Sequence, residues 1–472
     1  MLVSLSIIGP IQVSAVSTNQ TKYSNEDLAE DLAEKTPCIQ YEIAQKLIKV
    51  RCKSTHLTDI YKELNDPSIL GIEEPQNGRI SSADKKNVWV LDAGIVVERE
   101  GSLIIDSTDT SWLKITSSPT LQLKGEVSKD TSDTKGKKVI VVSKHNGDNP
   151  NGIHVHGSLK IDSVKITSWD PEKNDVIKLS LGKRQGEEHT KSDYDTAEPR
   201  AFIRISKLAT GTTDITNSEL AYLGYSCSRC SGLSYYGGDG SLIKGNDIHH
   251  LLKGFYSKNM GSMLIEGNKF HDNYLYGIDP HTGSHDIVIR KNMVYNNNAS
   301  GIICSKDCHS LLIENNVVYN NTGAGRGISF SINTTNSVAR NNLVYDNSRC
   351  IAFNRNSNYN EVYNNTVSNC RTGIYVSDTS NNLIHNNEIL NSTNGILLKN
   401  ITNQIYDNDI TNTKNGIVFI SESLPNQTKK SDIDDTLLAD IVANNNFLNT
   451  TSVSQIKDET LNTTSIEIPD KK

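Results

Sequence analysis

A six-residue phrase recurs along the second half of this 472-residue chain. It first appears as Ile243-Lys244-Gly245-Asn246-Asp247-Ile248, and its asparagine returns at positions 268, 292, 316, 342, 365, 387 and 408. A second phrase, usually Gly-Ile or Gly-Phe, recurs in phase at Gly254, Gly277, Gly301, Gly327, Gly373, Gly395 and Gly416, with Cys350 replacing glycine in one unit. Two marks that share a period of about 22 to 24 residues indicate a repeat protein.

The length of this period limits the fold. A period of about 22 residues is too short for a strand-helix-strand unit, which needs about 30 or more, and the LxxLxL pattern of leucine-rich repeats is absent. Short β-branched runs between Asn and Gly turns suit three brief strands per coil, stacked in parallel about 4.8 Å apart. We therefore predict an all-β fold, a right-handed parallel β-helix (a solenoid) with a small N-terminal helical segment. The asparagines should form a hydrogen-bonded ladder, and the glycines should adopt left-handed backbone at a corner.

The repeat also suggests boundaries. Residues 86–420 are assigned to the β-helix, and residues 17–85 to an N-terminal arm with helical segments over 26–35 and 41–49. Residues 1–16 are predicted to be a signal peptide rather than a frayed first strand, although the usual positive start is missing. Residues 421–472 are predicted to contain a polar insertion, a last coil beginning at 444–447, and a disordered tail beyond Asn449.

Composition narrows the class of protein. The mean hydropathy of -0.45 and the lack of a long apolar run predict no membrane insertion, and the formal net charge of -7 argues against a nucleic-acid partner. Eight cysteines and the signal-like start fit an oxidising compartment, so we expect a secreted, periplasmic or cell-surface protein with disulfides. The pairs Cys38/Cys52, Cys227/Cys230 and Cys304/Cys308 are close in sequence, but the connectivity stays open. Neither a calcium-binding repeat nor a second CxxC motif occurs, so we predict no metal and no cofactor.

One coil breaks the pattern at Asp279-Pro280-His281. Proline cannot donate to a β ladder, so its place in a central strand is unusual; from this segment alone, a functional break and a solvated turn are equally good interpretations. The neighbouring coils favour function, because stacking should align cations that follow the in-phase glycine, or Cys350, by four or five residues. A row of cations in an acidic protein suits a polyanion. The predicted row consists of Lys258, His281, Lys306 and Arg355, and we add Tyr256 and Arg326 to the substrate-binding set.

The segment Tyr276-Gly277-Ile278-Asp279-Pro280-His281 resembles the YG(F/I)DPHD signature of the mannuronan C-5 epimerases, in particular the periplasmic type with a single β-helix. The resemblance extends over residues 86–420. It implies that His281 is the base that removes the C5 proton, and that Asp279 orients the site. It also implies that Tyr276 donates a proton from the opposite face, and that Lys306 neutralises the substrate carboxylate where the family has arginine. The chain further differs at Thr282, where the motif has Asp, and at Ser300, where the family often has His.

This reaction requires such a set of residues. Removing the C5 proton of a uronate builds negative charge that a nearby cation must stabilise, and a base that titrates near neutral pH suits histidine. The resemblance therefore implies an isomerase, a C-5 epimerase that converts mannuronate to guluronate in an alginate-like anionic polysaccharide, and we expect a monomer. The alternatives are a polysaccharide lyase on the same fold, which shares the first step, and a non-catalytic carbohydrate-binding solenoid at the cell surface.

Overall fold

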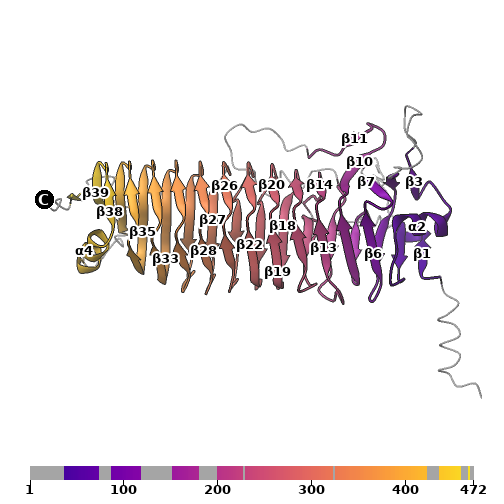
Figure 1. Ribbon diagram of the computed structural model, residues 1–472, viewed down its shortest axis with the longest axis horizontal. Helices are drawn as coiled ribbons and strands as arrows, with labels where there is room; N and C mark the ends of the chain where they lie inside the picture. Colours follow the sequence, from indigo (N-terminus) through magenta and orange to yellow (C-terminus); the bar gives the residue numbers. More distant parts are fainter. Residues whose placement is uncertain are drawn as a thin grey trace, which may run out of the picture. The chain divides into compact units, whose positions relative to one another are not determined.

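The computed structural model describes residues 37–73, 87–117, 151–179, 199–226, 229–322, 325–421, 435–458 and 466–467. The chain divides into two compact units, residues 1–38 and 39–472, and the second unit is a parallel β-helix. Its strands stack coil upon coil from the indigo end to the yellow end of Figure 1. The predicted signal peptide and the predicted helix over 26–35 lie outside the described residues.

The early coils are irregular, as expected from their loose spacing. They contain the short helices η1 (Ile43–Gln45) and α2 (Leu57–Leu64). Their strands are β1 (Ile39–Glu42), β2 (Leu47–Val50), β3 (Leu70–Ile72), β4 (Asn87–Leu91), β5 (Gly94–Val97), β6 (Ser102–Asp106), β7 (Thr110–Thr116), β8 (Ile153–Val155), β9 (Ser158–Asp162), β10 (Lys165–Asp170), β11 (Asp175–Val176), β12 (Ile203–Ile205), β13 (Thr213–Thr216), β14 (Glu219–Ala221), β15 (Gly232–Tyr235), β16 (Leu242–Lys244) and β17 (Asp247–His249).

The later coils repeat a first, a second and a third strand. These strands are β18 (Lys253–Lys258), β19 (Gly261–Glu266), β20 (Lys269–His271), β21 (Ile278–His281), β22 (His285–Arg290), β23 (Met293–Tyr295), β24 (Ile302–Cys304), β25 (Leu312–Glu314), β26 (Val317–Tyr319), β27 (Arg326–Ser331), β28 (Val338–Arg340), β29 (Leu343–Tyr345), β30 (Arg349–Asn354), β31 (Glu361–Tyr363) and β32 (Thr366–Ser368). The first and second strands then fuse in β33 (Thr372–His385) and β35 (Asn394–Tyr406), which alternate with β34 (Glu388–Leu390) and β36 (Asp409–Thr411). The last elements are β37 (Asn415–Ser421), α4 (Asp435–Ala443), β38 (Asn446–Leu448), β39 (Ser452–Asp458) and β40 (Ile466–Glu467).

Inside the coils, apolar side chains at matching positions form columns. In the first strands, Phe255, Ile278, Ile302 and Ile328 are all fully buried, because β18, β21, β24 and β27 pair in parallel. Alternation along each strand then turns the neighbouring side chains outward. The outward side of these first strands, called the first-strand face below, carries the residues that sequence assigns to the site.

The asparagine ladder is confirmed. Asn316 donates from Nδ2 to Asn342 Oδ1 at 3.0 Å and to the Ile289 carbonyl at 2.9 Å. Its own Oδ1 accepts from Asn292 Nδ2 at 3.0 Å. The same bonds join the ladder from Asn246 to Asn445, so each buried amide satisfies turn backbone that water does not reach.

The prediction that the in-phase glycines adopt left-handed backbone was wrong. The in-phase glycines have no left-handed backbone; that conformation occurs instead at turn residues such as Asn315 and Asn341. Glycine is required because the next coil lies too close. A Cβ on Gly277 would lie 2.6 Å from Val294 Cγ1 and 2.7 Å from the Gly301 carbonyl oxygen.

Two boundary predictions also need correction. The expected helix over 41–49 is a strand, a short 3-10 turn and a second strand, and β2 pairs with β5 in parallel, so coils begin before residue 86. The last coil is confirmed by the pairing of β38 with β36, but the tail beyond Asn449 continues as β39, which pairs with β37. Most of the predicted insertion, residues 422–434, lies outside the described residues.

Disulfides link Cys304 to Cys308 and Cys350 to Cys370. Cys38, Cys52 and Cys230 are disulfide-bonded as well, whereas Cys227 lies outside the described residues. Among the described residues, no helix has the length and apolar character that crossing a bilayer requires.

Candidate active site

The interruption at Pro280 lies within strand β21. On one side, β21 pairs regularly with β18, so that Tyr256 lies beside Asp279 and Lys258 beside His281. On the other side, the regular pairing with β24 is reduced to one position, Ile278 with Ile302. Proline has no N–H to donate, although its carbonyl still accepts from the Ser305 N–H at 3.1 Å. The break therefore loosens the ladder at the coil that carries Asp279 and His281.

Asp279 is fully buried on the first-strand face, and both of its oxygens have partners. Lys253 Nζ lies 2.9 Å from Oδ2, and the Ser305 hydroxyl donates to Oδ1 at 2.6 Å. A buried carboxylate held in this way is suited to fixing its neighbours rather than to taking a proton. Sequence reasoning missed Lys253. The signal was available, because Lys253 precedes the in-phase glycine just as Tyr276 does one coil later.

His281 is half-buried at the end of β21. Its Nδ1 lies 2.6 Å from the Thr282 hydroxyl oxygen, and its ring centroid lies 5.5 Å from that of Tyr256. Burial lowers the pKa of His281; Asp279 opposes this, and three nearby lysine ammonium groups add to the lowering. These lysines are Lys253, Lys258 and Lys306. His281 is therefore neutral at neutral pH, which is the protonation state that a general base needs.

Two tyrosines border this histidine and aspartate. Burial raises the pKa of Tyr276, and the Asp279 carboxylate adds to the rise, while Arg326 opposes it. Burial also raises the pKa of Tyr256, with smaller contributions from Tyr236 and Asp279. Lys253 Nζ lies 4.3 Å from the centroid of Tyr256 and 5.4 Å from that of Tyr276. Both phenols therefore keep their protons at neutral pH and can donate them.

The predicted cation row is only partly in line. Lys258 lies directly beside His281, whereas Lys306 is one residue further along, where the Gly283 N–H donates to its carbonyl at 3.2 Å. The Lys306 side chain is 51% exposed, and its Nζ forms a long, solvent-exposed ion pair of 3.8 Å with Asp307 Oδ2. Arg355 follows β30 as an exposed residue in the corresponding turn two coils beyond Lys306.

Arg326 and Arg349 extend the same face. Arg326 opens β27 and lies in register with Arg349, which opens β30. Sequence reasoning named Arg326 but missed Arg349, which precedes Cys350 at the position where the other coils have their in-phase glycine. The structure thus brings Tyr256, Lys258, Tyr276, Asp279 and His281 together and places Arg326 two coils away.

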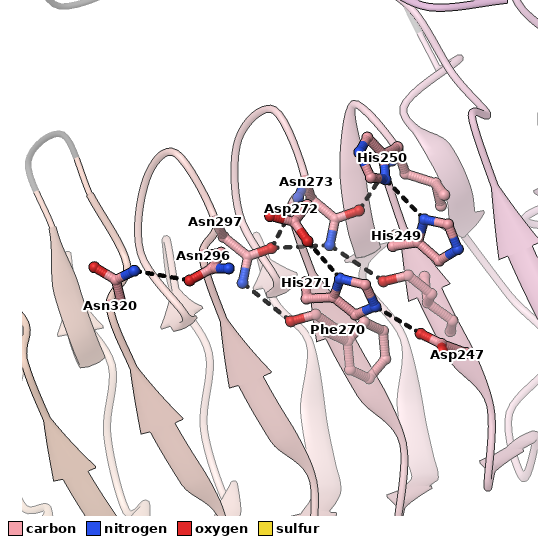
Figure 2. A network of polar contacts seen from close by, with 12 residues as sticks. Asp247, His249, His250, Phe270, His271, Asp272, Asn273, Asn296, Asn297 and Asn320 are labelled. Atoms are coloured by element: carbon pink, nitrogen blue, oxygen red, sulfur yellow. Dashed lines mark hydrogen bonds and ion pairs between the residues drawn. The ribbon is translucent and has the colours of Figure 1, made fainter.

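A second histidine cluster lies in the third-strand sheet (Figure 2). His271 Nε2 lies 2.8 Å from Asp247 Oδ1 and Nδ1 lies 2.6 Å from Asp272 Oδ2. Burial acts to lower the pKa of His271, but the hydrogen bonds to the two carboxylates outweigh it and raise the pKa. Both ring nitrogens are occupied, and the ring stacks on those of His249 and Tyr295. The contacts of His271 within the fold account for this cluster, whereas among the described residues His281 has a hydrogen-bond partner at Nδ1 but not at Nε2.

One group of described residues has the composition of a metal site, namely His56, Asp106 and Asp109. Asp109 Oδ2 already accepts from the Thr58 N–H at 2.9 Å, and Oδ1 accepts from the Thr110 hydroxyl at 2.7 Å. These bonds explain Asp109 without a metal.

Fold and site together define a right-handed parallel β-helix protein with a neutral histidine among lysines and tyrosines on one outer face. A family model described as "Right handed beta helix region" matches residues 205–367, and one described as "Periplasmic copper-binding protein (NosD)" matches residues 327–468. The crystal structure of the periplasmic alginate epimerase AlgG has the same fold, with a TM-score of 0.58 and 18% identity over 94% of this chain and 100% of that one.

The sequence of this chain is similar to those of several mannuronan C5-epimerases. The mannuronan C5-epimerase of Pseudomonas putida is 31% identical over 270 residues, which cover 53% of this chain and 44% of the relative. That of Pseudomonas fluorescens is 30% identical over 147 residues, which cover 28% and 24%. The chain thus matches less than half the length of these relatives. Over the matched part, its sequence is similar to mannuronan C5-epimerases, in agreement with the resemblance of the motif that ends at His281.

Proposed function

We propose that this chain is a C5-epimerase that converts mannuronate to guluronate units in an alginate-like polysaccharide. The observation that carries the proposal is His281, a neutral imidazole with three lysine ammonium groups near it and a phenol on either side of the buried Asp279. The sequence relatives from Pseudomonas, which are mannuronan C5-epimerases, support the same reaction.

The first step is removal of the C5 proton. Thr282 occupies Nδ1 of His281, so Nε2 takes the proton, and the electron pair of the C–H bond passes into the uronate carboxylate as an enolate. Lys258 and Lys306 are the nearest exposed cations and would stabilise that charge. Lysine binds a carboxylate through one point charge, without the two-pronged hydrogen bond of the family's arginine.

The second step is reprotonation of C5 from the opposite face. Tyr276 and His281 border the two ends of β21 with Asp279 between them, so a sugar ring over Asp279 would meet one group on each side. Tyr276 would give its phenolic proton to C5 and recover one from solvent, while His281 releases the proton that it took. Asp279 acts indirectly, because it holds Lys253 against both phenols.

The site faces an anionic polymer, and the disulfides Cys304–Cys308 and Cys350–Cys370 fit an oxidising location. We therefore propose a periplasmic or secreted enzyme.

Proton NMR of polymannuronate incubated with the full chain tests this function. New guluronate signals support an epimerase. A new 4,5-double bond, seen by ultraviolet absorbance, would instead identify a lyase, because both reactions share the first step. Binding of the polymer without either product would leave a carbohydrate-binding solenoid.

A further inference from the structure

Two arginines stand side by side on the first-strand face with no acid to balance them. Arg326 and Arg349 occupy paired positions of β27 and β30. Burial lowers the pKa of Arg326, and the like charges of Arg349 and Arg355 lower it further. Among the described residues, no carboxylate forms an ion pair with Arg326 or Arg349. Like charges directly opposite each other on a sheet are destabilising.

Several other cations in the strands of this solenoid have acidic partners. Arg340 Nη2 lies 2.7 Å from Glu314 Oε2, and Lys165 Nζ lies 2.9 Å from Glu219 Oε1. Arg290 Nε lies 3.3 Å from Glu266 Oε1. The pair Arg326–Arg349 differs from these three cations in having no acidic partner among the described residues.

The hydrogen bonds of Arg326 are incomplete. Its Nε is buried and has no partner among the described residues, and its one hydrogen bond, from Nη1 to the Ser329 hydroxyl, is long at 3.4 Å. A buried polar group without a partner normally has an explanation, such as a missing ligand. The Arg349 side chain is held in place by stacking on Tyr375, whose ring centroid lies 3.7 Å from the guanidinium carbon.

We propose that Arg326 and Arg349 form a second carboxylate site, separate from the one at His281. A planar guanidinium group can donate two parallel hydrogen bonds to one carboxylate. Two adjacent arginines would therefore bind one carboxylate together or two successive carboxylates separately. The identity of the ligand as a polyuronate rests on the proposed function. Coils spaced about 4.8 Å apart place the two arginines roughly 10 to 14 Å along the solenoid from the coil of His281, in the column of Tyr276 rather than that of His281. A chain bound at His281 and running along the solenoid would reach this site only when it is several units long.

The test measures binding of oligomannuronates of increasing length to the full chain by calorimetry. The double variant Arg326→Gln/Arg349→Gln should bind long oligomers at least about tenfold more weakly, as expected for losing charged hydrogen bonds, and should bind the shortest oligomers as the wild type does. The control Arg340→Gln also removes one arginine from a strand but lies outside this face, so it should bind every length normally. Melting temperatures check that each variant is folded.

Equal binding of wild type and double variant at all lengths would overturn the proposal. A loss of the same size at every length would also overturn it, because the arginines would then act at His281. Equal affinity for neutral mannan oligomers would exclude a carboxylate site. If the length-dependent loss occurs while the wild type converts no mannuronate, the carboxylate site stands and the proposed epimerase function fails.

Discussion

Lys253 Nζ and Asp279 Oδ2 lie 2.9 Å apart and join two coils beneath the first-strand face. The aspartate is fully buried and the lysine side chain is only 16% exposed. The pair therefore holds the Lys253 ammonium group in place, and this group contacts the rings of both Tyr256 and Tyr276.

Breaking this pair should cost stability. Asp279→Ala leaves the Lys253 charge buried without a partner, which we expect to lower the free energy of unfolding by about 3–5 kcal/mol. The control Asp286→Ala removes an exposed aspartate and should change it by less than about 1 kcal/mol. Chemical denaturation measures both. A loss no larger for Asp279→Ala than for the control would contradict a structural role for the pair.

The dependence of activity on pH should follow His281. Its folded pKa lies below the usual value of 6.5, so the active neutral form persists as the pH falls below that value, and activity declines only as the pH passes the lower, folded pKa. Lys258→Gln removes one of the charges that lower this pKa, so the acid limb of the kcat/KM profile should move to higher pH. An acid limb that stays in place or moves down would contradict the assignment of the limb to His281.

The asparagine ladder should matter for stability rather than for chemistry. Asn316→Ala leaves the Ile289 carbonyl and the Asn292 amide without their partners, and each buried unsatisfied group costs about 1–3 kcal/mol. Asn298→Ala changes an exposed asparagine outside the ladder and is the matched control. Thermal unfolding of both variants measures the difference; similar melting temperatures would show that the ladder contributes little.

Binding of a polyuronate should weaken as salt rises. The proposed contacts from Lys258 and Lys306 are exposed to solvent, and the Debye length falls from about 10 Å at 0.1 M to about 3 Å at 1 M ionic strength. Calorimetric titrations at low and high salt, with neutral mannan as the control, measure the effect. An affinity for the polyuronate that does not change with salt would argue against recognition by charge.

The fold was predictable because its signals are periodic. The columns containing Asn316 and Gly277 mark each coil, and stacking alone then sets which residues are neighbours. The prediction of a helix over 41–49 was wrong because the alternation typical of a strand is short there. Only Ile48 and Val50 show it, and both are buried and pair with the next coil. Glycine's role was misjudged since a close approach of backbone leaves no mark in the sequence beyond glycine itself.

The candidate site was predictable in part. Counting from the in-phase glycine placed Lys258 beside His281 correctly, because the ladder between β18 and β21 is regular. The count gave Lys306 as five residues after its glycine and His281 as four, and the structure accordingly places Lys306 one residue further along than His281. Lys253 precedes its in-phase glycine as Tyr276 does, so its place in the column could be predicted, but its burial against an aspartate one coil away could not.

Wash-in of solvent deuterium at C5 of polymannuronate measures the role of His281 most directly. In heavy water, the wild type and the control His285→Ala, whose histidine lies on β22 outside the site, should both incorporate deuterium at C5. His281→Ala, folded to the same melting temperature, should incorporate none above the level without enzyme. Incorporation by His281→Ala at the rate of the control would show that another group takes the proton.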